Sequence, residues 1–71
     1  MMKNENERKR IGSRIAELRA AVGMTQTELA ERAGIERCHI VRIEQGRYSV
    51  GIDILSAIGN ALGQRVDFIE N

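Results

Sequence analysis

The sequence has no proline, no tryptophan and few aromatic side chains, which make up 3% of its 71 residues. Any hydrophobic core must therefore be built from aliphatic side chains.

The single cysteine, Cys38, excludes an internal disulfide and is typical of a reducing compartment. No apolar run is long enough to cross a bilayer and nothing resembles a signal peptide, so we expect a cytoplasmic protein. We also expect one domain with a small core, and such domains often gain stability by associating.

Few residues are available for metal binding or covalent catalysis. Cys38 and His39 are the only cysteine and the only histidine. Two adjacent soft ligands with no others cannot complete a zinc site. They cannot form a nucleophile pair either, because neighbouring side chains on a helix point apart. We therefore expect no metal, no cofactor and no enzymatic activity.

The charges are unevenly distributed, although the formal net charge of +1 does not by itself indicate a nucleic-acid-binding protein. Residues 1–24 carry six basic and three acidic side chains, which gives +3. Residues 25–48 carry four of each and are neutral, and residues 49–71 carry one basic and three acidic side chains, which gives −2. This asymmetry would orient the molecule on a polyanion. On charge alone, an ordinary solvated surface is the favoured interpretation.

Helical periodicity recurs through the chain and predicts an all-α fold. Ile11, Ile15, Leu18 and Val22 are spaced four, three and four apart, which places them on one face of a helix that starts near residue 8. The other helices are predicted at about 26–33, 37–45 and 52–62. Residues 1–7 lack periodicity and are predicted to form a flexible tail, so the helical domain should cover residues 8–63.

The stretch from Thr25 to Gly46 predicts two short helices joined by a tight turn. Thr25 and Glu28 have the spacing of a capping box. Gly34 follows Ala33 at the position where a helix ends in the left-handed conformation. Small residues around this turn allow the two helices to approach at a steep angle. This is the geometry of the helix-turn-helix, whose second helix can lie in the major groove of DNA.

The run TQTELAERAGI, followed by RIEQG, resembles the phage-repressor and Xre-type helix-turn-helix family. The similarity continues into GIDILSAIGNALG, which looks like the fourth helix of that family, and it covers about residues 10–63. The resemblance implies a sequence-specific regulator of transcription, most readily a repressor, that binds double-stranded DNA. Residues 37–45 would enter the major groove, and a dimer would bind an inverted-repeat operator.

Candidate DNA contacts follow from this resemblance and from the geometry of the predicted helix. Arg37, Cys38 and Arg42 match the family positions that most often touch bases, and Val41 flanks them. Arginine can donate two hydrogen bonds to guanine, and Val41 or Cys38 can contact a thymine methyl group. The alternative is a solvated helix face. The residues that match the family's phosphate-binding positions are Gln26, Thr27, Arg47, Tyr48 and Ser49.

Two glutamates need separate interpretations. Glu36 is expected on the inward side of its helix, where the family prefers serine or threonine as a better N-cap. Glu44 is also predicted to face inward, and Arg19 matches the arginine that the family pairs with this glutamate. We therefore expect a partly buried ion pair between Arg19 and Glu44 that ties the third helix to the first.

Residues 64–71 replace the family's fifth helix with a short segment of strand periodicity, in which Val66 and Phe68 alternate with charged residues. A lone strand in a helical chain has unpaired backbone groups. We therefore predict a homodimer joined through antiparallel C-terminal strands, with Val66, Phe68 and Ile69 buried. The alternative is a tail folded back over its own core as an extra helical turn.

Three other functions remain open. The chain could be the antitoxin of a toxin–antitoxin pair, which would repress its own operon through this fold and bind a toxin through another surface. It could be a protein-interaction module that does not bind DNA, an interpretation favoured by Glu36 and opposed by Arg37 and Arg42. It could also be a small enzyme, although no set of residues supports that function.

Overall fold

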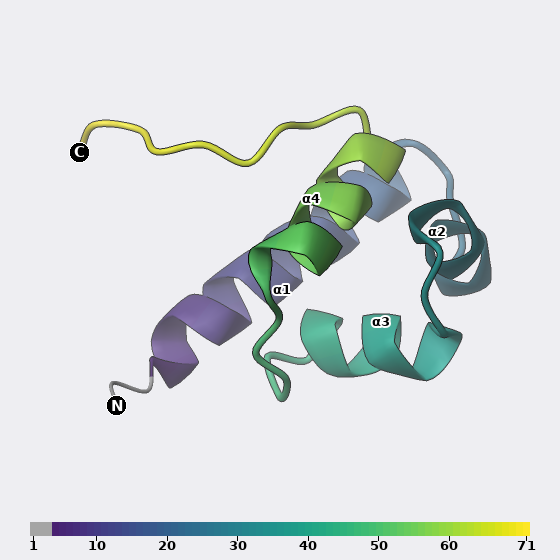
Figure 1. Ribbon diagram of the computed structural model, residues 1–71, viewed down its shortest axis with the longest axis horizontal. Coiled ribbons are helices and arrows are strands. Elements are labelled where there is room, and N and C mark those ends of the chain that lie inside the picture. Colours follow the sequence, from purple (N-terminus) through teal and green to yellow (C-terminus); the bar gives the residue numbers. More distant parts are fainter. Residues whose placement is uncertain (1–3) are drawn as a thin grey trace.

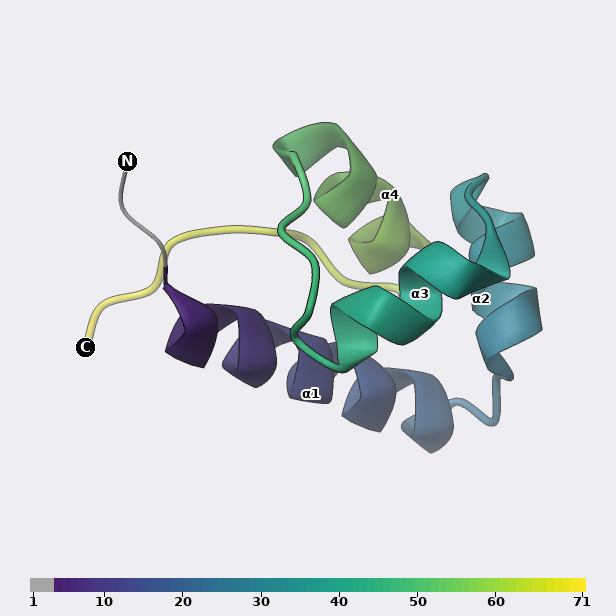
Figure 2. The same ribbon diagram turned by 90° about the horizontal axis from the view of Figure 1, so that it is seen from below.

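The computed structural model describes residues 4–71, and these form four helices: α1 (Glu5–Ala21), α2 (Gln26–Ala33), α3 (Arg37–Glu44) and α4 (Ile52–Ala61). The long α1 runs along one side of the molecule, α3 crosses it, and α2 lies at one end (Figures 1 and 2). No strand is present in the described part of the chain. The all-α prediction is therefore confirmed.

Helix α1 begins at Glu5, earlier than the start predicted near residue 8. Asn4 is its N-cap, and the Asn4 side chain accepts a hydrogen bond of 3.1 Å from the backbone N–H of Glu7. Glu5 and Glu7, both in the first turn, also lie near the positive end of the helix dipole. The sequence prediction relied on apolar spacing, which this first turn lacks. The rest of the predicted tail, residues 1–3, lies outside the described residues.

The helix-turn-helix has the local geometry that its sequence predicts. Thr25 and Glu28 form both hydrogen bonds of the capping box at the start of α2. Gly34 ends α2 with a φ of 74°, a left-handed conformation that glycine adopts without steric cost. The backbone N–H of Ile35 then donates to the carbonyl of Ala30 at 3.0 Å, which closes the turn. Helix α2 has the predicted bounds, and α3 ends one residue earlier, with Gln45 as its C-cap.

The core is aliphatic, as the composition requires. Leu29 from α2, Ile40 from α3 and Ile58 from α4 have no exposed surface. Burying a side chain of this size typically contributes about 1.5–3 kcal/mol to stability. The remaining buried apolar residues are Ile15, Met24, Ala30, Ile43 and Leu62.

Helices α1 and α3 touch through their backbones at Gly12. A Cβ atom at this position would overlap the carbonyl oxygen of Ile43 and crowd that of Glu44. Only a residue without a side chain therefore allows α3 to cross α1 at this distance. The spacing of apolar residues gave no indication of this contact.

The predicted C-terminal strand is not formed in the single chain. Residues 64–71 leave α4 as an extended segment with neither helix nor strand, drawn yellow in Figure 1. A strand needs the backbone of a neighbouring strand as its hydrogen-bond partner, and this helical chain supplies none. The segment does not fold back as a helical turn either, since Phe68 is 100% exposed and Ile69 is 89% exposed.

Candidate nucleic-acid interface

Helix α3 has one buried face and one exposed face. Ile40 and Ile43 are packed into the core, whereas Arg37, Cys38 and Arg42 are exposed on the other side. The structure thus places three of the four predicted base-contacting residues where a ligand can reach them. The fourth, Val41, is half-buried, which leaves less of its surface for a thymine methyl group.

Glu36 does not face inward as predicted. It is the N-cap of α3, with an extended backbone, and its exposed side chain makes no capping hydrogen bond. The thiol of Cys38 donates to the Glu36 carboxylate at 3.5 Å. A negative charge therefore stands at the end of the exposed face, beside Arg37.

The predicted ion pair between Arg19 and Glu44 is present. The guanidinium Nε of Arg19 lies 2.7 Å from Glu44 Oε2, and Nη2 lies 3.1 Å from Oε1. The Arg19 and Glu44 side chains are 19% and 7% exposed. The third nitrogen, Nη1, donates to the backbone carbonyl of Met24 at 2.9 Å. The hydrogen bonds that Arg19 donates to the Glu44 carboxylate raise the pKa of the guanidinium. The ion pair joins α3 to the end of α1.

Gln26, at the first position of α2, does not project freely toward a phosphate. Its amide nitrogen donates to Glu44 Oε1 at 3.1 Å, and its amide oxygen accepts from Arg37 Nη2 at 3.4 Å. The side chain thus lies between the ion pair and the first residue of α3. The sequence pattern assigned Gln26 to phosphate binding and gave no sign of these two contacts.

The other residues predicted to bind phosphate are exposed. They are Thr27 near the start of α2 and Arg47, Tyr48 and Ser49 in the loop before α4. The Tyr48 ring stacks in parallel on the ring of His39, with 5.8 Å between their centroids. Arg47 Nη1 donates to the side chain of Gln45 at 3.3 Å. His39 therefore supports this loop from α3, a role that the sequence did not reveal.

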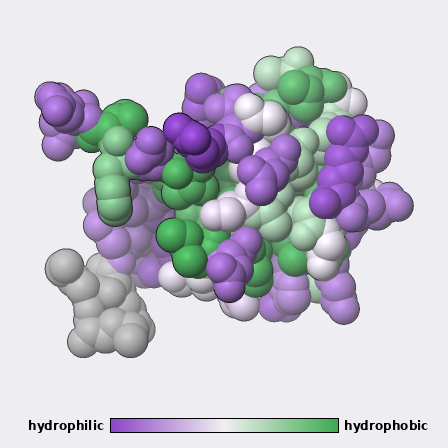
Figure 3. Space-filling view, turned by 45° about the horizontal axis from the view of Figure 1, so that its top comes forward, coloured by the Kyte–Doolittle hydropathy of each residue, from purple (hydrophilic) through white to green (hydrophobic). Residues whose placement is uncertain are grey.

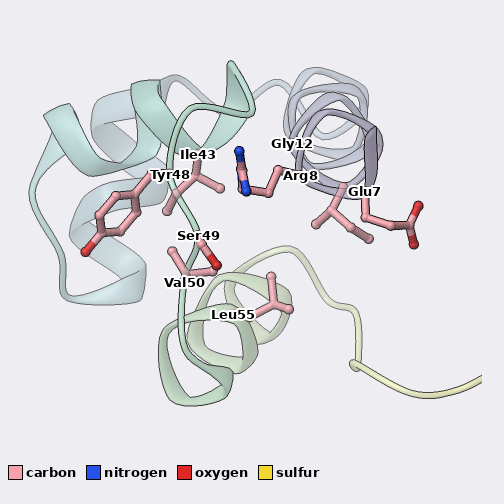
Figure 4. Close-up of a pocket in the computed structure, with 9 residues that line it drawn as sticks. Glu7, Arg8, Gly12, Ile43, Tyr48, Ser49, Val50 and Leu55 are labelled. Atoms are coloured by element: carbon pink, nitrogen blue, oxygen red, sulfur yellow. The ribbon is translucent and has the colours of Figure 1, made fainter. Parts of the chain in front are cut away.

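A small cavity of about 170 Å³ lies between α1 and this loop. Figure 4 shows Arg8 and Glu7 on the α1 side of the cavity and Tyr48 and Ser49 on the loop. The Arg8 Nε donates to the carbonyl of Gly46 at 3.4 Å, which joins α1 to the end of α3. This contact connects the basic first helix to the loop that carries the predicted phosphate ligands.

The described residues show neither a metal site nor a membrane-spanning helix. Among residues 4–71, no cluster of three or more His, Cys, Asp or Glu side chains is arranged to hold a metal ion. None of the helices in this part of the chain combines the length and apolar character needed to cross a membrane.

A helix-turn-helix family model matches residues 15–69, which is most of the chain. The chain belongs to the helix-turn-helix family. This match confirms the resemblance that the sequence motifs carry, and it makes the protein a regulator of this class rather than an enzyme.

Individual members of the family are similar to this helix-turn-helix protein over most of its length. An uncharacterised HTH-type transcriptional regulator of Methanothermobacter thermautotrophicus is 46% identical over 50 residues, which are 70% of this chain and 72% of that protein. The immunity repressor protein of Bacillus phage phi105 is 37% identical over 59 residues, which are 83% of this chain but only 41% of the repressor. The crystal structure of the restriction-modification controller protein C.AhdI from Aeromonas hydrophila is 28% identical in sequence, with a TM-score of 0.82. The match covers 84% of this chain and 91% of that one.

Proposed function

We propose that this helix-turn-helix protein represses transcription by inserting α3 into the major groove of a specific duplex site. The observation that carries the proposal is the exposed face of α3. Arg37 and Arg42 project from a helix whose other face is fixed by the core and by the ion pair at Glu44. A rigidly mounted helix with exposed arginines is suited to reading base edges. The similarity to a phage immunity repressor supports repression. The proposed location is the cytoplasm.

In this proposal the exposed residues of α3 have separate roles. Arg37 and Arg42 donate to the O6 and N7 atoms of guanine, the commonest specific contact of arginine in the major groove. Cys38 and the exposed part of Val41 contact thymine methyl groups. Glu36 accepts from a cytosine amine, which is the one arrangement in which its charge does not simply repel the DNA.

Phosphate contacts would flank this helix on both sides. Gln26 and Thr27 belong to the first turn of α2, where backbone N–H groups and the positive end of the helix dipole attract anions. Arg47, Tyr48 and Ser49 are exposed on the loop that follows α3. Together these residues would fix the orientation of α3 in the groove without reading sequence.

The proposed assembly is a homodimer that binds an inverted repeat. Val66, Phe68 and Ile69 are 42%, 100% and 89% exposed, which is unusual for large apolar side chains. A groove of about 240 Å³ runs beside Val66, lined mostly by apolar side chains of α1 and α4 and by residues 64–67 at the start of the tail. Figure 3 shows apolar side chains on the protruding tail and on the adjoining body. The C-terminal segments of two copies would pair as antiparallel strands over these surfaces and supply the backbone partner that a single chain lacks.

The exposed tail also favours one second candidate, an antitoxin whose C-terminal segment binds a toxin. The two assignments differ in what covers Phe68: a second copy of this chain or another protein. Sedimentation of the purified chain at micromolar concentration distinguishes them. A dimer of the chain alone supports the first assignment, and a monomer that dimerises neither alone nor on DNA favours the second.

Selection of bound sequences from a random duplex pool tests the proposed function directly. The expected result is an inverted repeat whose half-sites are one helical turn apart, about 34 Å or 10 base pairs. If no sequence is enriched at moderate salt, DNA reading is refuted, and the chain is better interpreted as a protein-interaction module.

A further inference from the structure

The cavity between α1 and the loop before α4 has mainly apolar walls. They include Ile11 of α1, Val50 of the loop and Leu55 of α4, all half-buried, together with the buried Ile43 of α3. The volume is about 170 Å³. An apolar cavity of about 150 Å³ can bind benzene, so this space is large enough for one aromatic ring or a short branched chain.

The charged group at this cavity is the guanidinium of Arg8, which lies between α1 and the loop (Figure 4). The Arg8 side chain is only 25% exposed, and its contacts are long: 3.4 Å from Nε to the Gly46 carbonyl oxygen and 3.8 Å from Nη2 to Glu5 Oε1. The Glu7 carboxylate points away from the cavity in Figure 4 and accepts hydrogen bonds of 2.6 and 2.7 Å from Arg10. Among residues 4–71, Arg8 therefore has no carboxylate within hydrogen-bond distance.

We propose that this cavity binds a small apolar carboxylate, such as an aromatic or branched-chain acid, which acts as an effector of DNA binding. The apolar part of the ligand lies against Ile11, Val50 and Leu55, and its carboxylate accepts charge-assisted hydrogen bonds from Arg8. Ser49 lines the same cavity, and its hydroxyl can donate one more. An inorganic anion would leave the apolar walls uncovered, and a neutral apolar molecule would leave the guanidinium without a partner.

The position of the cavity determines the direction of the effect. Tyr48 and Ser49, two of the residues proposed to contact phosphate, line it from the loop. A bound carboxylate places a negative charge behind this loop and neutralises Arg8, so the loop attracts DNA phosphates less. The ligand thus weakens DNA binding, and DNA weakens ligand binding by the same factor. This effect rests on the proposed DNA-binding function, whereas binding of the ligand itself does not.

The experiment uses benzoate as the probe, because it joins one aromatic ring to a carboxylate. Titration of the full chain without DNA, at constant ionic strength, is followed through the NMR signals of the methyl groups in the cavity walls. Benzyl alcohol supplies the ring without the charge, and acetate supplies the charge without the ring. The variants are Arg8→Met, which removes the guanidinium, and Val50→Phe, which fills the cavity. Arg14→Met is the matched control, because it removes an exposed arginine of α1 that does not line this cavity.

Benzoate should bind the wild type and Arg14→Met with a Kd of about 1 mM, a value suited to so small a ligand. Binding should be at least about 10-fold weaker for benzyl alcohol, for acetate, and for benzoate with either cavity variant. Melting temperatures establish that each variant is folded, and Arg8→Met alone decides if Val50→Phe is not. No change in the wall signals of the wild type, or equal binding to the wild type and Arg8→Met, would overturn the ligand site.

A second measurement tests the effector role. Saturating benzoate should raise the Kd of the wild type for its selected DNA site by about 5-fold or more, and should leave the Kd of Arg8→Met unchanged. Benzoate that binds in the cavity without changing DNA affinity would overturn the effector role. A wild type that binds benzoate but selects no DNA sequence would refute the proposed function and leave the ligand site established.

Discussion

Arg19 and Glu44 join α1 to α3 at two points, with 2.7 Å between Nε and Oε2 and 3.1 Å between Nη2 and Oε1. The ends of α1 and α3 are thus connected by a charged contact that is largely shielded from solvent. Removing one partner leaves the other charge unpaired in a site with little access to water. Replacing both leaves no charge there.

The first prediction follows from this asymmetry. We expect Arg19→Met and Glu44→Leu each to lower the free energy of unfolding by about 2–4 kcal/mol, less than for a fully buried pair because Arg19 is partly exposed. The double variant should recover much of that loss. Thermal or urea denaturation of the four proteins measures the coupling. Strictly additive losses would show that the two side chains do not depend on each other in solution.

The second prediction concerns pH and the capping box of α2. Hydrogen bonds from the backbone and side chain of Thr25 lower the pKa of Glu28 below its usual value of 4.5. A group whose pKa is lower in the folded state contributes stability above its unfolded pKa and loses it as the pH falls through the folded value. We therefore expect the stability difference between the wild type and Glu28→Gln to be present at pH 6 and to shrink below about pH 4.5.

The control for this measurement is Glu31→Gln, an exposed residue of the same helix that is not part of the capping box. Its melting temperature should follow that of the wild type across the same pH range. If Glu28→Gln and Glu31→Gln behave alike, the capping box does not contribute to the acid sensitivity.

The third prediction concerns Gly12. Glycine inside a helix usually costs about 0.5–1 kcal/mol relative to alanine, so Gly→Ala in α1 would ordinarily stabilise the protein. Here the added Cβ would overlap the carbonyl oxygen of Ile43, and α3 would have to move. We expect Gly12→Ala to destabilise the fold by at least about 1–3 kcal/mol. Gly59→Ala, inside α4, is the control, because there the nearest non-adjacent atom lies 3.4 Å from the new methyl group, an ordinary contact distance.

The fourth prediction tests base reading by Arg42. We expect Arg42→Ala to weaken binding to the selected site by about 1–3 kcal/mol and to relax discrimination at one base pair. Arg32→Ala, which removes the same charge from an exposed position on α2, should not alter discrimination. If Arg42→Ala instead weakens binding to every sequence equally, Arg42 contacts phosphate.

The sequence was most informative where structure depends on neighbouring residues. The capping box and Gly34 define α2 and its turn, and they are visible as local spacing. The first turn of α1 was missed because it is stabilised by the polar cap Asn4 and not by an apolar face. Gly12 could not be interpreted, since its importance depends on an atom of α3, 31 residues away.

The candidate site shows the same division between local and distant information. Arg19 and Glu44 were paired through the family resemblance, and the structure brings them together. The two contacts of Gln26 depend on how α1, α2 and α3 meet, which no periodicity encodes. The alternation around Phe68 describes a segment that can pair as a strand, but pairing requires a second backbone that one chain does not provide.

The last prediction concerns this C-terminal segment. A chain truncated after Gly63 keeps all four helices and loses the exposed apolar side chains of the tail. We expect the full-length protein to sediment as a dimer at micromolar concentration and the truncated protein as a monomer. Phe68→Ser should shift the equilibrium toward monomer, whereas Glu70→Ser, a polar change in the same segment, should not. If the full-length and truncated proteins are both dimers, or both monomers, the tail is not the interface.

Because half-sites one turn apart require two α3 helices held about 34 Å from each other, the truncated protein should also lose preference for the inverted repeat while still binding single half-sites weakly.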